Sequence, residues 1–297
     1  MPTAAATAAE PTRRCAVLGS PVAHSLSPVL HRAAYRALGL SGWTYDAHDV
    51  DAAGLAAFLD ALDDGWRGLS LTMPLKRTVL PLLDEVDEQA ARASAANTVL
   101  LHGGRRSGHN TDVPGAVGAL QERRQGPLRR AVVLGGGATA GSVVLALADL
   151  GCEDVTLMVR DPARAAGTLA VAGRHPRRPR VRAARLGAGP VPADVLVSTI
   201  PAAAQDDGVV RLAEDVDVVF DVVYDPWPTP LARAARGAGR VLVSGLDLLV
   251  HQAVLQVRLM TGATDVPLEA LRAAGERALA ARVARGVGAA GPAGSAR

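Results

Sequence analysis

Lysine is nearly absent from this sequence: of its 32 basic side chains, 31 are arginines and one, Lys76, is a lysine. Arginine stays protonated at any working pH, whereas a lysine amine can be pushed toward neutrality and can exchange a proton. A lone lysine is therefore a candidate for acid–base chemistry on a carbonyl or an alcohol. Most lysines are solvated surface residues, so residue type alone favours that interpretation until the neighbouring motifs are considered.

Cysteines and long apolar runs are also scarce. The two cysteines, Cys15 and Cys152, are too few for a disulfide framework or a structural zinc site, so we expect no metal and a reducing, cytoplasmic location. No apolar stretch approaches the ~20 residues of a membrane helix, so we expect no membrane partner. The basic segment 174–182 has no aromatic side chain on which a base could stack. We interpret it as a solvated loop, and we expect no nucleic-acid partner.

The rest of the composition is that of a globular protein with two domains. The chain has 297 residues, of which 49% are hydrophobic and 21% are charged, and this length allows two separate cores. Short apolar segments alternate with helical ones, which predicts an α/β fold. The order of the motifs described below, together with the family that they resemble, implies a mixed α/β domain at residues 13–112, completed by helices within 245–285, and a doubly wound Rossmann-type domain at 113–244. Residues 1–12 and 286–297 are predicted to be loose tails.

A loop rich in serine and proline follows the first predicted strand, residues 15–19. Its last residue, Pro28, is well placed to begin a helix with Ser27 as the N-cap. Ser25 and Ser27 can serve as helix caps, or their hydroxyls and the positive end of the helix can receive a carboxylate. These two interpretations are compatible.

Lys76 follows a predicted strand, residues 68–73, and a proline. The sequence has only two asparagines, Asn97 and Asn110, and each precedes a threonine. Both are suited to turns. Asn97 could instead use its amide to donate to and accept from a polyol.

A glycine-rich turn joins the predicted strand 131–134 to an apolar helix. The turn has the pattern G-x-G-x-x-A, which lets the backbone approach a pyrophosphate at a helix N-terminus, and its flanking strand and helix are the expected ones. The next strand ends at Arg160, and Arg164 follows one helical turn later. Arginine at this position favours the 2′-phosphate of NADP over NAD. Asp161 complicates this interpretation unless it caps the following helix.

A string of motifs in this order resembles the shikimate dehydrogenase family, whose members reduce 3-dehydroshikimate with NADPH. The resemblance covers nearly all of residues 13–285. The motifs that carry it are Gly19-Ser20-Pro21 through Pro28, Thr72 to Lys76, Asn97-Thr98, Asn110-Thr111-Asp112 with Gly115, the glycine turn, Asp221 to Pro226 with Thr229-Pro230-Leu231, and Gly245 with Gln252.

The resemblance implies a role for each of several residues. Lys76 and Asp112 would be the catalytic acid–base pair. The substrate would be held at its carboxylate and its ring hydroxyls by Ser25, Ser27, Thr72, Lys76, Asn97, Asp112, Tyr224 and Gln252. The cofactor, NADP, would lie against Gly135, Gly136, Gly137, Ala138, Thr139, Arg160, Arg164, Val222 and Gly245. The active site would then lie in the cleft between the two domains.

Three positions depart from the family pattern. Ser70 stands where the family often has asparagine, and Leu248 stands where a methionine is expected. The segment Val159-Arg160-Asp161 replaces the usual Asn-Arg-Thr, which keeps the arginine but leaves the preference for the 2′-phosphate less secure. None of these changes affects Lys76 or Asp112.

The expected activity is the reversible, NADPH-dependent reduction of 3-dehydroshikimate to shikimate, a step toward chorismate and the aromatic amino acids. One alternative is an NAD-dependent quinate/shikimate dehydrogenase. Another is a non-catalytic paralogue that binds shikimate and a nucleotide. A short-chain dehydrogenase would need a tyrosine four residues before its lysine, where this chain has Thr72. The expected partner is a small-molecule substrate, and the protein is expected to be a monomer or a homodimer.

Overall fold

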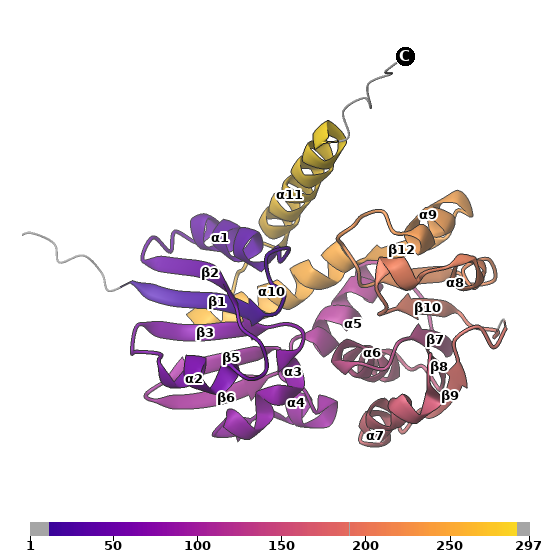
Figure 1. The fold of residues 1–297 in the computed structure, drawn as a ribbon, viewed down its shortest axis with the longest axis horizontal. Helices are drawn as coiled ribbons and strands as arrows, with labels where there is room; N and C mark the ends of the chain where they lie inside the picture. Colours follow the sequence, from indigo (N-terminus) through magenta and orange to yellow (C-terminus); the bar gives the residue numbers. More distant parts are fainter. Residues whose placement is uncertain (1–11, 190, 290–297) are drawn as a thin grey trace, which may run out of the picture.

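Two six-stranded sheets lie next to each other in the computed structural model, which describes residues 12–189 and 191–289 (Figure 1). The first sheet uses strands from the N-terminal part of the chain and the second uses strands from the middle. Two helices, α5 and α10, run between them. This arrangement confirms the predicted α/β fold with a mixed sheet and a Rossmann-type sheet.

The first sheet is mixed, with the strand order β2-β1-β3-β5-β6-β4. Its strands are β1 (Arg13–Gly19), β2 (Trp43–Asp49), β3 (Trp66–Leu71), β4 (Glu85–Val86), β5 (Thr98–His102) and β6 (Arg105–His109). β1 is parallel to β2 and β3, whereas β5 is antiparallel to β3 and β6. Successive residues of β1 are buried in different clusters, Val17 in one and Leu18 in another. Since successive side chains of a strand point to opposite faces, this sheet is covered on both faces.

Four short helices accompany this sheet: α1 (Ser27–Ala37), α2 (Leu55–Asp60), α3 (Leu75–Thr78) and α4 (Glu88–Ala93). A 3₁₀ turn at Leu80–Leu82 follows α3. α1 begins at Ser27 with Leu26 as its N-cap and with no side-chain cap. The prediction that Ser27 is the N-cap is therefore wrong, because the helix begins one residue earlier and the side chain that meets its first backbone N–H is that of Ser25.

The second sheet is entirely parallel, with the strand order β12-β11-β10-β7-β8-β9. Its strands are β7 (Arg130–Leu134), β8 (Asp154–Val159), β9 (Arg180–Arg185), β10 (Val195–Ser198), β11 (Val218–Asp221) and β12 (Val241–Ser244). The chain leaves β7 toward β8 and β9 and then returns to the other side of β7 to form β10. This reversal is the position at which doubly wound sheets bind ligands, beyond the carboxyl ends of the strands.

The helices around the second sheet are α6 (Ala138–Asp149), α7 (Ala166–Gly173), α8 (Asp207–Arg211) and α9 (Pro230–Gly237). Short 3₁₀ turns lie at Pro162–Ala165 and Ala202–Ala204. The strands of this sheet are mostly buried, as expected for a parallel sheet between two helical layers.

Helices α5 (Asp112–Arg123) and α10 (Gly245–Thr261) pack against each other between the sheets (Figure 1). A Cβ atom on Gly115 of α5 would lie 2.9 Å from the Cβ of Gln252 on α10, so glycine permits the close approach. α10 begins with a capping box in which Ser244 and Asp247 exchange side-chain to backbone hydrogen bonds. This packing brings residues near position 112 beside residues near position 252.

The last helix, α11 (Leu268–Ala289), packs against α1 and α10 and then extends away from the body (Figure 1). The sequence predicts a loose tail from residue 286, whereas the helix continues to Ala289 because no proline interrupts it before Pro292. The rest of both predicted tails, apart from Thr12, lies outside the described residues. Among the described helices, none has both the length and the apolar character that spanning a membrane requires.

The basic segment 174–182 is tied to neighbouring elements. Arg174 donates to Ser94, and His175 contacts Asp149 at 2.9 Å. Arg180 forms two hydrogen bonds of 2.8 Å with Asp154. The interpretation of this segment as a solvated loop is therefore wrong in part, because residues 180–182 belong to β9 and His175 is buried.

Candidate active site

The side chains of Lys76 and Asp112 meet between the two sheets. Lys76 lies on α3, directly after β3, and Asp112 is the first residue of α5. Lys76 Nζ donates to Asp112 Oδ2 at 2.7 Å, and the two side chains are only 15% and 6% exposed. The single lysine is therefore held away from bulk solvent by a buried carboxylate.

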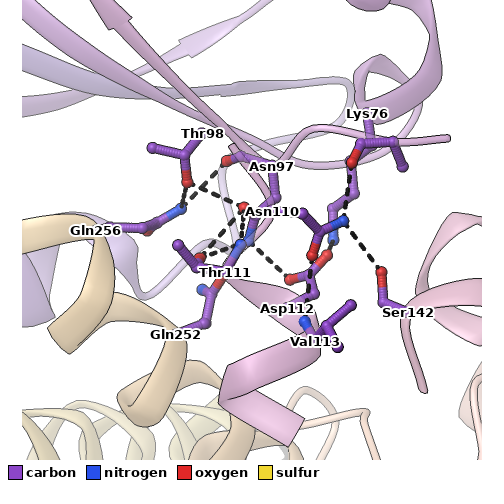
Figure 2. A network of polar contacts seen from close by, with 11 residues as sticks. Lys76, Asn97, Thr98, Asn110, Thr111, Asp112, Val113, Ser142, Gln252 and Gln256 are labelled. Atoms are coloured by element: carbon purple, nitrogen blue, oxygen red, sulfur yellow. Dashed lines mark hydrogen bonds and ion pairs between the residues drawn. The ribbon is translucent and has the colours of Figure 1, made fainter. Parts of the chain in front are cut away.

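Asn97 lies behind this pair and is itself 1% exposed (Figure 2). Its Nδ2 donates to Asp112 Oδ1 at 2.9 Å and to Gln252 Oε1 at 2.8 Å, and it also lies 2.9 Å from Thr111 Oγ1. Its Oδ1 accepts from the backbone N–H of Thr111 at 2.8 Å and from Thr98 Oγ1 at 2.9 Å. Both ends of the amide are occupied, so Asn97 orients Asp112 and Gln252 without facing the cavity itself.

A cavity of about 150 Å³ opens in front of the Lys76–Asp112 pair. We call it the Lys76 cavity. Of the residues predicted to bind substrate, it is lined by Ser25, Ser27, Thr72, Lys76, Asp112, Tyr224 and Gln252. It is also lined by three residues predicted to bind the cofactor, Thr139, Val222 and Gly245. The cavity thus brings residues of the first sheet, α6, the loop after β11 and α10 to one place.

One wall of this cavity consists of hydroxyl groups. Ser25 Oγ accepts from the backbone N–H of Ser27 at 3.2 Å, which orients the loop at the start of α1. Burial raises the pKa of Tyr224, although contacts with Leu26 and Ser25 act in the opposite direction. The phenol of Tyr224 therefore stays protonated and can donate a hydrogen bond. A set of hydroxyl donors at a helix N-terminus is suited to a carboxylate.

The Lys76 cavity is also lined by two polar residues that were not predicted to bind substrate, Ser70 and Gln256. Ser70 Oγ accepts from the hydroxyl of Tyr45 at 2.6 Å and donates to Gln256 Oε1 at 2.9 Å. Gln256 Nε2 donates to the backbone carbonyl of Asn97 at 3.1 Å and to Thr98 Oγ1 at 3.0 Å. The hydroxyl hydrogen of Ser70 is used inside this network, so toward the cavity Ser70 can only accept.

A sequence signal for Gln256 does exist. It follows Gln252 by four residues on an apolar helix, which places both amides on the same helix face. The apolar cavity residues Val17, Leu71, Leu248 and Leu249 have no comparable signal.

The glycine turn lines a second cavity, of about 380 Å³, which we call the Gly135 groove. Gly135 and Gly136 form one side of it, at the point where β7 separates β8 from β10. Gly135 has a φ of +104°, and a Cβ atom there would lie 2.4 Å from Thr199 Oγ1. Only glycine fits this position without strain, and the groove leaves the backbone open to a ligand.

The other predicted cofactor residues lie around this groove. Gly137 is the N-cap of α6 and Ala138 is its first residue, and neither lines either cavity. A Cβ atom on Gly245 would lie 2.3 Å from the carbonyl oxygen of Val222, so glycine is required there as well. The side chain of Arg164 lies outside the described part of the structure.

Arg160 and Asp161 lie at the far side of the Gly135 groove. Asp161 Oδ1 accepts from the backbone N–H of Ala163 at 3.0 Å, so this carboxylate caps the following 3₁₀ turn. The Arg160 side chain is exposed, and it has no ion-pair partner in the part of the chain that the structure describes. An arginine in this position is free to bind a phosphate.

The loop that carries Val222 and Tyr224 is anchored by a buried carboxylate. Asp221 Oδ2 accepts from Thr229 Oγ1 at 2.7 Å and from Gln205 Nε2 at 2.9 Å. Burial raises the pKa of Asp221. These hydrogen bonds hold the end of β11 in place beside both cavities.

Two family models match parts of this sequence, and both describe shikimate dehydrogenase domains. A model described as the shikimate dehydrogenase substrate binding domain matches residues 17–99, and one described as the shikimate 5′-dehydrogenase C-terminal domain matches residues 245–274. The sequence is 37% identical to the shikimate dehydrogenase (NADP(+)) of Moorella thermoacetica over 262 residues, which covers 83% of this chain and 87% of the relative.

Solved structures agree with the sequence comparison. The crystal structure of shikimate 5-dehydrogenase from Thermus thermophilus in complex with NADP(H) and shikimate has a TM-score of 0.79 and 36% identity, covering 90% of this chain and 100% of that chain. The quinate dehydrogenase from Corynebacterium glutamicum in complex with NAD has a TM-score of 0.79 and 31% identity, covering 90% of this chain and 99% of that one.

Proposed function

The chain belongs to the shikimate dehydrogenase family, and we propose that it catalyses the reversible, NADP-dependent interconversion of 3-dehydroshikimate and shikimate. The observation that carries this proposal is the buried Lys76–Asp112 pair, which faces a cavity that also reaches Thr139 of the glycine turn. This reaction is a step toward chorismate and the aromatic amino acids.

Lys76 and Asp112 are proposed to donate the proton in the reductive direction and to accept it in the oxidative direction. In the reductive direction, the ammonium of Lys76 stabilises the alkoxide charge that builds on the carbonyl oxygen and then donates its proton there. Asp112 holds the amine at the cavity wall through the 2.7 Å contact and accepts from a neighbouring substrate hydroxyl. In the oxidative direction the pair takes up the proton that the alcohol loses.

The remaining polar groups of the cavity are proposed to orient a small cyclic acid. The hydroxyls of Ser25, Ser27 and Tyr224 would bind its carboxylate. Thr72 and Gln252 would bind its ring hydroxyls, with Asn97 orienting Gln252 from behind. Fixing the ring in this way supplies much of the rate enhancement, because the reacting atoms no longer have to find each other.

The Gly135 groove fits a dinucleotide that carries a 2′-phosphate. Gly135, at a positive φ where a Cβ atom would clash with Thr199, has no side chain to block the approach of a pyrophosphate. Arg160 is free to bind the 2′-phosphate because the Asp161 carboxylate caps the following 3₁₀ turn. When bound, NADPH supplies the hydride. The chain's own residues then need only to position the substrate, exclude water and move the proton.

The experiment that tests this proposal is a measurement of initial rates for the purified protein with shikimate and either NADP⁺ or NAD⁺. We expect a much higher kcat/KM with NADP⁺. Absence of shikimate oxidation with either cofactor, in protein shown to be folded, would refute the proposed function.

A second candidate function is an NAD-dependent quinate/shikimate dehydrogenase. The similarity to the quinate dehydrogenase of Corynebacterium glutamicum supports this candidate, whereas the exposed Arg160 argues against it. Quinate in place of shikimate, assayed with both cofactors, distinguishes the two. A non-catalytic paralogue would bind both ligands without turnover, and the presence of both Lys76 and Asp112 argues against it.

We also propose the division of the chain into a substrate domain, residues 13–112 with the helices from 245 to 285, and a nucleotide domain, residues 113–244. We propose a cytoplasmic location and a monomeric or homodimeric state. Light scattering of the purified protein measures the oligomeric state directly, and a tetramer would contradict it.

A further inference from the structure

Arg282 on α11 contacts two loops that carry hydroxyl groups of the Lys76 cavity, one with Ser25 and one with Tyr224. We call the hydroxyls of Ser25, Ser27 and Tyr224 the hydroxyl wall. Arg282 Nη1 donates to the backbone carbonyl of His24 at 2.8 Å and to Asp225 Oδ2 at 2.7 Å. His24 lies in the loop after β1 and Asp225 lies in the loop after β11. The Arg282 side chain, 25% exposed, thus links the loop after β1 to the loop after β11.

Each of the two anchored residues is the sequence neighbour of a cavity residue. Ser25 follows His24, and Tyr224 precedes Asp225, and both line the Lys76 cavity. No backbone-to-backbone hydrogen bond joins the two loops within residues 12–189 and 191–289. Side-chain contacts join the two loops instead: the phenol of Tyr224 meets Ser25 and the backbone of Leu26, and Arg282 supplies two further contacts.

The charge of Arg282 is offset by its partner. Because the guanidinium is paired with Asp225, it adds little net positive potential to the cavity. Its effect on a bound carboxylate is therefore geometric: it keeps the donors of two separate loops at a fixed spacing before the ligand arrives. Donors held in place in advance bind more tightly, because less ordering is left for the ligand to impose.

We propose that Arg282 is a positioning residue for the substrate carboxylate, acting through Ser25 and Tyr224 and not touching the substrate itself. This inference rests on the proposed function, since it assigns the hydroxyl wall to the carboxylate of shikimate. It gives the C-terminal helix a role in substrate affinity and none in the chemical step or in cofactor binding.

The test is steady-state kinetics of Arg282→Ala and Arg282→Lys with shikimate and NADP⁺. For Arg282→Ala we expect the KM for shikimate to rise about tenfold, because small misplacements of binding groups have effects of this size or more. The KM for NADP⁺ should stay within about twofold of the wild-type value, and kcat should change little. Arg282→Lys retains one donor and should recover part of the lost affinity.

Two control variants separate geometry from charge and from general damage to α11. Arg277→Ala removes an exposed arginine from the same helix and should leave both KM values unchanged. Asp225→Asn leaves the positive charge of Arg282 uncompensated. If Arg282 acted through its charge, this variant would lower the KM for shikimate, whereas a geometric role predicts a KM that does not fall, because the asparagine amide oxygen can still accept from the guanidinium.

A substrate analogue makes the test specific to the carboxylate. With a shikimate analogue that lacks the carboxyl group as a competitive inhibitor, the ratio of inhibition constants between Arg282→Ala and wild type should be close to one. A wild-type enzyme that oxidises shikimate, with an Arg282→Ala variant of unchanged KM, would overturn the inference. An equal rise in the KM values for shikimate and NADP⁺ would overturn it as well. If the wild type failed to oxidise shikimate at all, it is the proposed function that would fall.

Discussion

The Lys76 cavity and the Gly135 groove are neighbours that are built in different ways. The cavity is lined by polar side chains, several of which are hydrogen-bonded to other side chains: Asp112 accepts from Asn97, and Ser70 donates to Gln256. The groove is shaped by the backbone of a glycine turn, with one exposed arginine at its far side. A ligand in the cavity is therefore selected by side-chain chemistry, whereas a ligand in the groove is selected by shape and by the charge of Arg160.

The largest expected effect comes from the cavity. Lys76→Ala should lower kcat about 1000-fold, because general acid–base catalysis by a positioned group is worth this order of magnitude. The Kd for NADP⁺, measured by fluorescence titration, should stay nearly unchanged, because Lys76 does not line the groove. Arg77→Ala, at the exposed neighbouring residue, serves as the control. If Lys76→Ala retained most of the wild-type kcat, the assignment of acid–base catalysis to the Lys76 cavity would be wrong.

The second largest expected effect is on the KM for NADP⁺, from a change in the glycine turn that lines the Gly135 groove. Gly135→Ala should raise the KM for NADP⁺ about 100-fold, since the new Cβ atom would displace Thr199 and strain a positive φ. The Kd for shikimate, measured by calorimetry without cofactor, should be unaffected. Gly103 also has a positive φ, of +57°, but has open space around it, so Gly103→Ala controls for the strain alone. Equal losses in both variants would contradict the assignment of the groove.

A smaller effect is expected at the far side of the groove. Arg160→Ala removes one charged contact to a 2′-phosphate, worth about 2 kcal/mol, and should lower the ratio of kcat/KM for NADP⁺ over NAD⁺ about 30-fold. The value for NAD⁺ itself should hardly change. Arg36→Ala, an exposed arginine on α1, should leave the ratio intact. An unchanged ratio in Arg160→Ala would assign the cofactor preference to another residue.

The smallest effect concerns the free energy of unfolding and its dependence on pH through the buried His31. His31 stacks on Tyr45 and lies 3.3 Å from Gln256 Oε1, and burial lowers the pKa of His31 to about 3 from its ordinary 6.5. Below pH 6.5 the unfolded chain takes up a proton there that the folded protein does not. The free energy of unfolding should therefore fall as the pH drops from about 6.5 toward 3, by up to about 1.4 kcal/mol per pH unit.

The measurement is urea denaturation of wild type and His31→Phe at several pH values. The phenylalanine keeps the ring stack and removes the titration, so the variant should lose less stability between pH 7 and pH 5 than the wild type. His102→Asn, at an exposed histidine, should retain the wild-type slope. Parallel slopes for wild type and His31→Phe would mean that His31 is not kept neutral by burial.

The same contrast between the two regions explains what the sequence predicts well. The glycine turn is a local signal: the strand, the glycines and the helix follow one another in the chain, so both the parallel sheet and the groove could be predicted from one segment. The family resemblance, now confirmed by sequence and structural relatives, extends the prediction to Lys76 and Asp112. Their catalytic roles stay predictions, although the structure brings the two side chains together.

The parts that could not be predicted depend on contacts between distant segments. Ser70, Tyr45 and Gln256 come from β3, β2 and α10, and nothing local in the sequence indicates that their polar groups meet. Asn97 is predicted to bind the ring hydroxyls, and this role stays a prediction; the structure shows its amide donating to Asp112 and Gln252. The sequence is misleading at Ser27, because a serine before a proline is a good cap signal, but the helix begins one residue earlier.

A crystal structure with shikimate and NADP⁺ bound tests the central claim most directly. We expect Lys76 Nζ to lie within about 3.2 Å of the substrate oxygen that changes oxidation state, with Asp112 still paired to the amine and the nicotinamide ring on the side of Thr139. A Lys76 side chain turned toward solvent, with another group beside that oxygen, would contradict the claim.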